Sequence, residues 1–122
     1  MNIQDIKMTF KYIGYNIDKN MPNMNDYKVK LSYNNNSMKI DFHMGKALKQ
    51  TDLTIESVIN SLLLDYIDYN TTFEDFCDEF GYSSDSIKAS KIYKQCQKNT
   101  EKMNNLFYVD ELESLREKLQ DY

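Results

Sequence analysis

Apolar and polar residues alternate with a period of two over the first third of the chain. The alternation runs through residues 6–12, 27–33 and 38–42, and this period is typical of strands with one buried face. Asn34–Asn36 separates the second stretch from the third, and asparagine tolerates the left-handed backbone of a tight hairpin turn. The segment 21–25 is expected to be a loop. The residues predicted to face inward are Ile6, Met8, Phe10, Tyr12, Tyr27, Val29, Leu31, Tyr33, Met38, Ile40 and Phe42.

After Gly45, which is expected to end the last strand, the period changes to that of an α-helix. Apolar residues recur at intervals of three and four and predict a helix over 54–69 that packs across the sheet. A second, two-turn helix is predicted over 73–80, with Thr72 as its N-cap and Gly81 as its stop. Its predicted buried face consists of Phe73, Phe76, Cys77 and Phe80.

The last third of the chain predicts two more helices. Ser84 or Asp85 is the expected N-cap of the first, and Asp110 together with Glu113 is expected to begin the second. The predicted inner face of the first consists of Ala89, Ile92, Tyr93, Cys96 and Met103, with Leu106 and Phe107 closing it. The second carries a stripe made of Leu112, Leu115 and Leu119.

The order of the elements, strands first and helices afterwards, is the α+β pattern. The chain has 122 residues, which is enough for one modest core, and it shows no internal repeat. We therefore expect a single α+β domain over 1–122. A small antiparallel β-sheet, a hairpin plus an N-terminal strand, occupies 6–45, and three to four α-helices follow over 54–122.

Composition narrows the class of protein without naming a reaction. The mean hydropathy is -0.69 and no apolar run is long enough to span a membrane. Two cysteines are too few for a disulfide scaffold, and the first residues do not read as a secretory signal. We expect a cytoplasmic protein.

The net charge of -4 is a near-cancellation of blocks with opposite signs. Residues 1–49 carry eight lysines and four aspartates, whereas residues 50–87 carry nine carboxylates and neither lysine nor arginine. Residues 88–102 carry five lysines and one glutamate. The sequence thus predicts an acidic region between two basic ones.

The acidic block supplies the first candidate binding surface. Four of its acids lie on the predicted 73–80 helix, opposite the apolar face, and Tyr66, Tyr69 and Tyr82 lie among the acids in sequence. Acids interleaved with aromatic residues are suited to occupying a basic groove on a partner. The candidate partner-binding residues are Asp65, Asp68, Glu74, Asp75, Asp78 and Glu79.

The basic block supplies the alternative surface. Its lysines recur on the side of the predicted third helix opposite the apolar face, where they are able to follow a line of phosphates. The candidate nucleic-acid face consists of Lys88, Lys91, Lys94, Lys98 and Lys102, together with the strand lysines Lys28, Lys30 and Lys39. A third interpretation is that both helices are simply solvated on their charged faces.

Residues with catalytic potential lack the partners that catalysis needs. His43 is the only histidine and lies on the outward side of a predicted strand, and Cys77 and Cys96 lie on apolar helix faces. No metal-ligand spacing, glycine-rich phosphate loop or nucleophile motif occurs. We expect a protein that is not an enzyme and that uses no cofactor or metal.

A run of residues resembles a widespread family of small phage and prophage proteins. The run has the form Phe-Glu-x-Phe-Cys-x-Glu-x-Gly-Tyr over 73–82, with Asp85-Ser86 and Lys88-Ala89 after it, and Tyr93 fills a further position. The strand pattern at 27–31 and the Phe-His-Met-Gly step at 42–45 also resemble the family, and the similarity covers roughly residues 27–106. Phe76 stands where the family commonly has tryptophan.

The resemblance implies a non-catalytic accessory protein of a mobile element that acts in the cytoplasm of a bacterial host cell. Small acidic phage proteins include inhibitors of host defence, anti-CRISPR proteins among them, so the implied partner is a host defence protein or ribonucleoprotein such as a CRISPR effector. Binding through the acidic face is the first hypothesis, nucleic-acid binding through the lysines the second. A dimerisation module, using the leucine stripe with Tyr122, is the third. Most residues of the shared pattern also serve folding.

Overall fold

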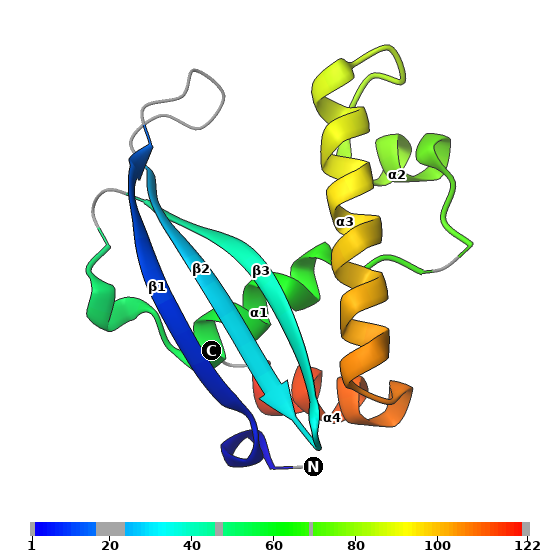
Figure 1. The fold of residues 1–122 in the computed structure, drawn as a ribbon. Coiled ribbons are helices and arrows are strands. Elements are labelled where there is room, and N and C mark those ends of the chain that lie inside the picture. Colours follow the sequence, from blue (N-terminus) through cyan, green and yellow to red (C-terminus); the bar gives the residue numbers. More distant parts are fainter. Residues whose placement is uncertain (1, 17–23, 46–47, 69, 121–122) are drawn as a thin grey trace.

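The computed structural model describes residues 2–16, 24–45, 48–68 and 70–120. A three-stranded antiparallel sheet forms one layer and helices form the other, which confirms the predicted α+β class (Figure 1). In the described part of the chain no helix has both the length and the apolar character needed to cross a membrane. The strands are β1 (Lys7–Asn16), β2 (Met24–Tyr33) and β3 (Asn36–Gly45), and the α-helices are α1 (Ile55–Asp65), α2 (Phe73–Phe80), α3 (Ile87–Leu106) and α4 (Val109–Lys118).

The sheet has the order β1-β2-β3, and the predicted hairpin joins β2 to β3. Asn34 and Asn35 form its turn with positive φ angles of 50° and 66°, the left-handed geometry that matches strand twist. The β2–β3 register is unbroken, whereas β1 shifts against β2 between Tyr12 and Gly14, where glycine adopts φ 147°. Met24 and Asn25 were expected in a loop but begin β2, and residues 21–23 lie outside the described residues.

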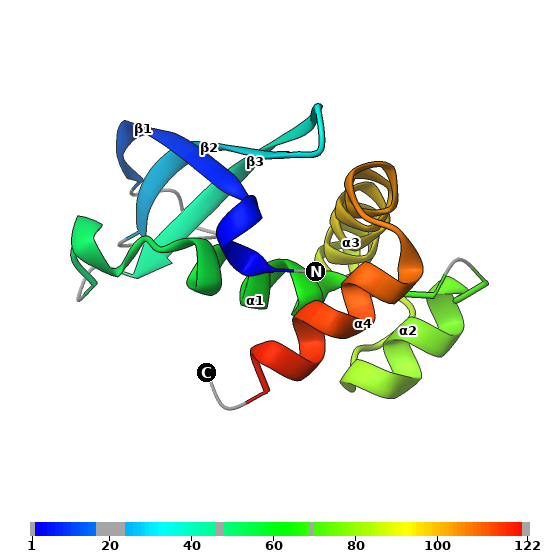
Figure 2. The same ribbon diagram turned by 90° about the horizontal axis from the view of Figure 1, so that it is seen from below.

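The inner face of the sheet packs on α1 and α4, as the view from below shows (Figure 2). The main core joins Val29, Leu31, Met38 and Ile40 of the sheet to Val58, Ile59 and Leu62 of α1 and Leu112, Leu115 and Leu119 of α4. The leucine stripe of α4 is therefore used within the chain and is not left for a second copy. Tyr122, its proposed companion, lies outside the described residues.

The second half of β1 faces the inner side of the sheet as predicted, but its side chains are not buried. Ile6 is buried, but Phe10 and Tyr12 are 39% and 48% exposed. β1 is an edge strand, and the helices cover only part of the inner face. The two rings pack instead against Tyr27, with centroids 6.0 and 5.3 Å away.

Helix α1 ends at Asp65 rather than at residue 69. Tyr66 has an extended backbone (ψ 122°), and the amide of Ile67 donates to Thr100 Oγ1 of α3 at 3.0 Å. This contact draws the chain toward α3, where Ile67, Phe76 and Cys96 form a second, smaller core.

The caps of α2 were predicted correctly, and those of the later helices were not. Thr72 Oγ1 accepts from the amide of Asp75 at 3.1 Å, and Gly81 ends α2 with φ 74°. Helix α3 is capped by Ser86, not by Ser84 or Asp85, because Ser86 Oγ accepts from the amide of Ala89 at 3.1 Å.

Helix α4 begins earlier than the pair Asp110 and Glu113 implied, since its N-cap lies two residues before Asp110. Its N-cap is Tyr108, whose amide donates to a Glu111 carboxylate oxygen at 2.9 Å. The Tyr33 hydroxyl of β2 also donates to Glu111, and this hydrogen bond raises the pKa of Tyr33 to about 12. Glu111 thus both caps α4 and holds it to the hairpin.

Candidate nucleic-acid interface

Lysines dominate the outer face of the sheet, which the helices leave open. Lys11 of β1 lies opposite Lys28 of β2, and Lys30 of β2 lies opposite Lys39 of β3. All four side chains are exposed. Like charges placed directly across two strands reduce the stability of a sheet, so folding alone gives no reason for these two pairs.

One carboxylate interrupts the lysines. Asp41 of β3 lies opposite Lys28, and its carboxylate is 2.6 Å from Lys28 Nζ. Both side chains are more than 60% exposed, so the ion pair contributes little to stability. Further along the same face, His43 Nδ1 lies 2.6 Å from the carboxylate of Asp26, which engages the histidine in a pair rather than in a catalytic pocket.

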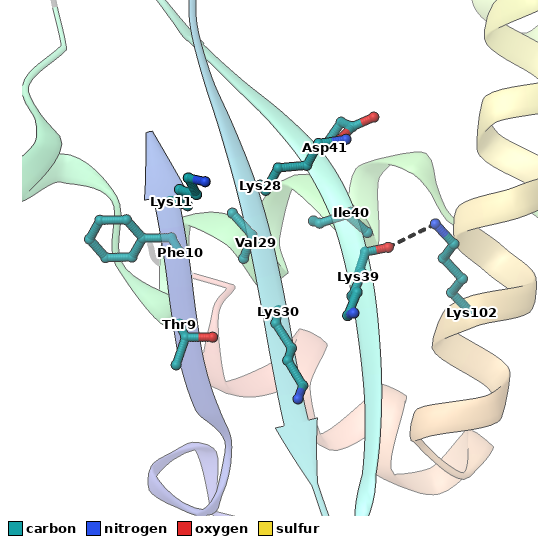
Figure 3. Close-up of a pocket in the computed structure, with 10 residues that line it drawn as sticks. All are labelled: Thr9, Phe10, Lys11, Lys28, Val29, Lys30, Lys39, Ile40, Asp41 and Lys102. Carbon is teal, nitrogen blue, oxygen red and sulfur yellow. Dashed lines mark hydrogen bonds and ion pairs between the residues drawn. The ribbon is translucent and has the colours of Figure 1, made fainter. Parts of the chain in front are cut away.

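The C-terminal half of α3 contacts the edge of this face. Lys102 Nζ donates to the backbone carbonyl oxygen of Lys39 at 2.8 Å (Figure 3). The contact is made across 63 residues of sequence and places the ammonium group beside the sheet lysines. Lys102 is half-buried, and it therefore has a structural role as well as a charge.

A shallow, open hollow of about 560 Å³ lies between the sheet and Lys102. Figure 3 shows that its lysines come from all three strands and, with Lys102, from α3. The lining residues are Thr9, Phe10, Lys11, Lys28, Val29, Lys30, Lys39, Ile40, Asp41 and Lys102. Such a hollow suits an extended anionic surface better than a small molecule that must be enclosed.

The other α3 lysines continue this surface along the helix. Lys88, Lys91, Lys94 and Lys98 are exposed. At about 100° per residue, they and Lys102 fall within an arc of roughly 120°, with Lys102 near its middle. Because Lys102 touches β3, the arc meets the sheet at the C-terminal half of α3. We call these residues the lysine surface: Lys11, Lys28, Lys30, Lys39, Lys88, Lys91, Lys94, Lys98 and Lys102.

The lysine surface contains every residue predicted for the nucleic-acid face and one that the prediction omitted. Lys11 was missed because its place opposite Lys28 depends on the pairing of β1 with β2, which the local sequence does not specify. Its outward position in a period-two strand was the available signal.

The predicted acidic face is only partly formed. Glu74, Asp75, Asp78 and Glu79 are exposed on α2, and within the described residues none of them makes an ion pair. Asp68 is exposed on the connection before α2 and accepts from the amide of Asn70 at 3.1 Å. We call the four α2 acids the acidic helix face.

Asp65 does not belong to this face, contrary to prediction. It is half-buried at the end of α1, where Asn99 Nδ2 of α3 donates to its carboxylate at 3.3 Å. Burial raises the pKa of Asp65, and the Asn99 hydrogen bond partly opposes that rise. Asn99 and Thr100, both buried on α3, were also absent from the predicted inner face.

The aromatic neighbours of the acids also differ from prediction. Tyr66 turns away to bond Asn104 at 2.8 Å and to lie under the guanidinium of Arg116, 5.0 Å from its ring centroid. Tyr69 lies outside the described residues. Tyr82 stacks on Phe76, and Phe80, which was expected to be buried, is 48% exposed and also packs on Phe76.

Both cysteines are free and buried, as expected from their apolar helix faces. Burial raises the pKa of Cys77, and burial together with the nearby Asp65 carboxylate raises the pKa of Cys96 to about 11. Thiols with such pKa values are poor nucleophiles at neutral pH. Among the described residues no group of three or more histidine, cysteine or acidic side chains is arranged to hold a metal ion.

No protein-family model, curated protein or solved structure matches this chain.

Proposed function

We propose that this protein is a non-catalytic accessory protein that binds the phosphate backbone of a nucleic acid through the lysine surface. The observation that carries the proposal is the convergence of sheet and helix lysines, with Lys102 bonded to the strand that carries Lys39. The two same-charge pairs across the strands support it, because an anionic ligand would relieve their repulsion.

The overall negative charge of the chain does not oppose this function. The acidic helix face lies on α2, which packs on α3 through Phe73, Phe76 and Tyr93 and not on the sheet. A ligand on the lysine surface therefore meets a locally positive field, and its affinity is expected to depend steeply on salt.

A charge-neutralising variant tests the proposal. The double variant Lys30→Gln/Lys39→Gln removes one same-charge pair, and Lys49→Gln/Lys118→Gln removes two exposed lysines outside the lysine surface. In fluorescence anisotropy at about 50 mM salt, the first variant is expected to bind a 20-bp DNA at least tenfold more weakly than wild type. The second variant is expected to match wild type. Equal loss in both variants would show that net charge alone, not this surface, controls binding.

The acidic helix face supports a second candidate function, the one implied by the phage resemblance. Here the protein inhibits a host defence complex, such as a CRISPR effector, by binding a basic surface of that complex. The specific observation in favour is that α2 exposes four acids, none of which makes an ion pair within the described residues, and that Phe80 and Tyr82 at its C-terminal end are exposed as well. Aromatic residues with a charged rim are typical of protein interfaces.

A matched pair of charge reversals tests this second function. The variant Asp78→Lys/Glu79→Lys changes the acidic helix face, and Glu113→Lys/Glu117→Lys makes the same change on exposed positions of α4. In a cleavage assay with a purified CRISPR effector, inhibition is expected to be lost only in the first variant, with melting temperatures within a few degrees. Inhibition that survives in the first variant would exclude the acidic helix face.

A further inference from the structure

We infer that the ligand of the lysine surface is a double-stranded nucleic acid, held by its phosphates. This inference rests on the proposed function and names the class of nucleic acid. Three features of the surface carry it: its two-dimensional layout, its lack of stacking rings and the chemistry of its cations.

The lysines are arranged in two rows rather than in one line. The sheet row contains Lys11, Lys28, Lys30 and Lys39 on three neighbouring strands. The helix row follows α3 from Lys88 to Lys102, which is about 21 Å at 1.5 Å per residue. The rows meet where Lys102 contacts β3, and Figure 1 shows the N-terminal half of α3 diverging from the sheet.

Two rows match the charge pattern of a duplex. A duplex carries phosphates on two backbones, with about one charge per 1.7 Å of its axis. The helix row alone thus spans the length of about twelve duplex phosphates. A single strand has one backbone and would occupy one row, leaving the repulsion within the other row unrelieved.

Within the part of the chain that the structure describes, the hollow offers unpaired bases no open ring to stack on. Single-strand binders combine positive charge with aromatic platforms. Among the described residues that line the hollow, Phe10 alone is aromatic, and its ring extends away from the lysines (Figure 3) and packs edge-on against Tyr27. Without a platform, a single strand gains only its phosphate contacts.

The cations of the surface are also suited to phosphates rather than to base edges. All of them are lysines, which act as point charges, whereas arginine reads guanine and stacks on bases. The chain has one arginine, Arg116, and it lies over the Tyr66 ring. Gln95 lies in the lysine arc of α3 and donates to Asn99 at 3.1 Å. Binding is therefore expected to be largely independent of sequence.

Anisotropy titrations at one salt concentration test the inference. The probes are a 20-bp DNA duplex, the same duplex with scrambled sequence, the equivalent RNA duplex, and a 20-nucleotide oligo(dT), which does not form a duplex. Wild type is expected to bind the DNA duplex at least tenfold more tightly than oligo(dT). Its affinity for the scrambled duplex is expected to lie within about threefold of its affinity for the original duplex. The titration with the RNA duplex shows which of the two kinds of duplex the protein prefers.

Two variants test the two rows separately. Lys30→Gln/Lys39→Gln changes the sheet row and Lys91→Gln/Lys98→Gln changes the helix row, and both are expected to weaken duplex binding by roughly tenfold. Oligo(dT) binding as tight as duplex binding, or a helix-row variant that binds the duplex like wild type, would overturn the inference but leave the proposed function standing. Absence of binding to every probe at 50 mM salt would overturn the proposed function itself.

Discussion

Lys30 and Lys39 lie directly opposite each other on β2 and β3, with both side chains exposed on the outer face of the sheet. This placement is a cost to the fold, because opposed like charges destabilise a strand pair by up to about 1 kcal/mol. It is a benefit only where an anion lies over both ammonium groups. The pair therefore links the stability of the sheet to the proposed function.

Reversing one charge of this pair is expected to weaken duplex binding and to stabilise the fold. In Lys39→Glu, the new carboxylate faces Lys30, and the free energy of unfolding is expected to rise by about 0.2–1 kcal/mol. Duplex affinity is expected to fall by more than tenfold. Denaturant unfolding and anisotropy measure the two effects, and Lys118→Glu on α4 serves as the matched control for binding. The account would be contradicted if Lys39→Glu were less stable than wild type and bound the duplex as tightly as wild type.

Removing the carboxylate among the lysines is expected to have the opposite effect on binding. Asp41 pairs with Lys28 at 2.6 Å, so Asp41→Asn frees that ammonium group and removes a negative charge. Duplex affinity is expected to increase several-fold, while stability changes by less than about 1 kcal/mol because the pair is exposed. Weaker binding in Asp41→Asn would indicate that Asp41 itself contacts the ligand.

The half-buried carboxyl of Asp65 is expected to make stability depend on pH. Because burial raises its pKa in the folded state, the unfolded chain loses this proton first as the pH rises. The contribution of the Asp65 carboxyl to the free energy of unfolding is therefore complete below about pH 4, and it is lost as the pH rises through the pKa of the folded state. Asp65→Asn removes the cost of burying an ionised carboxylate. Its melting temperature is therefore expected to exceed that of wild type at pH 7, and to exceed it by less at pH 3.5.

The exposed Asp68 provides the control for this measurement. Asp68→Asn is expected to leave the melting temperature unchanged at both pH values. If Asp65→Asn instead melts lower than wild type at pH 7, the charged carboxylate stabilises the fold and the assignment of a burial cost is wrong.

The two thiols are expected to be unreactive until the protein unfolds. Cys77 and Cys96 are 2% and 6% exposed, and burial raises the pKa of both. With Ellman's reagent at pH 8, we expect no fast phase in the native protein and two equivalents in denaturant. A Ser84→Cys variant, whose new thiol is exposed, is expected to react at once. A fast native phase in wild type would contradict the burial of these cysteines.

The sequence was sufficient for features that depend on local chemistry. The β2–β3 hairpin was predictable because asparagine favours the left-handed turn at 34–35 and the flanking residues alternate strictly. Helix α2 was predictable because Thr72 and Gly81 mark its two ends. These signals act within a few residues.

Features that depend on distant contacts were not predictable. Helix α1 ends early because the amide of Ile67 bonds Thr100, and Asp65 leaves the acidic face because Asn99 binds it. The lysine surface also depends on such contacts, since the pairing of strands and the Lys102 bond to β3 bring its two rows together. The sequence predicted most residues of the lysine surface but not their arrangement.

The salt dependence of duplex binding tests the central claim most directly. If the lysine surface neutralises about five phosphates, the logarithm of the association constant falls against the logarithm of salt with a slope of about -4.5. Because Lys30→Gln/Lys39→Gln removes two of these contacts, its slope is expected to be about 2 units shallower. A shallow slope in wild type, or the same steep slope in wild type and variant, would contradict binding through this surface.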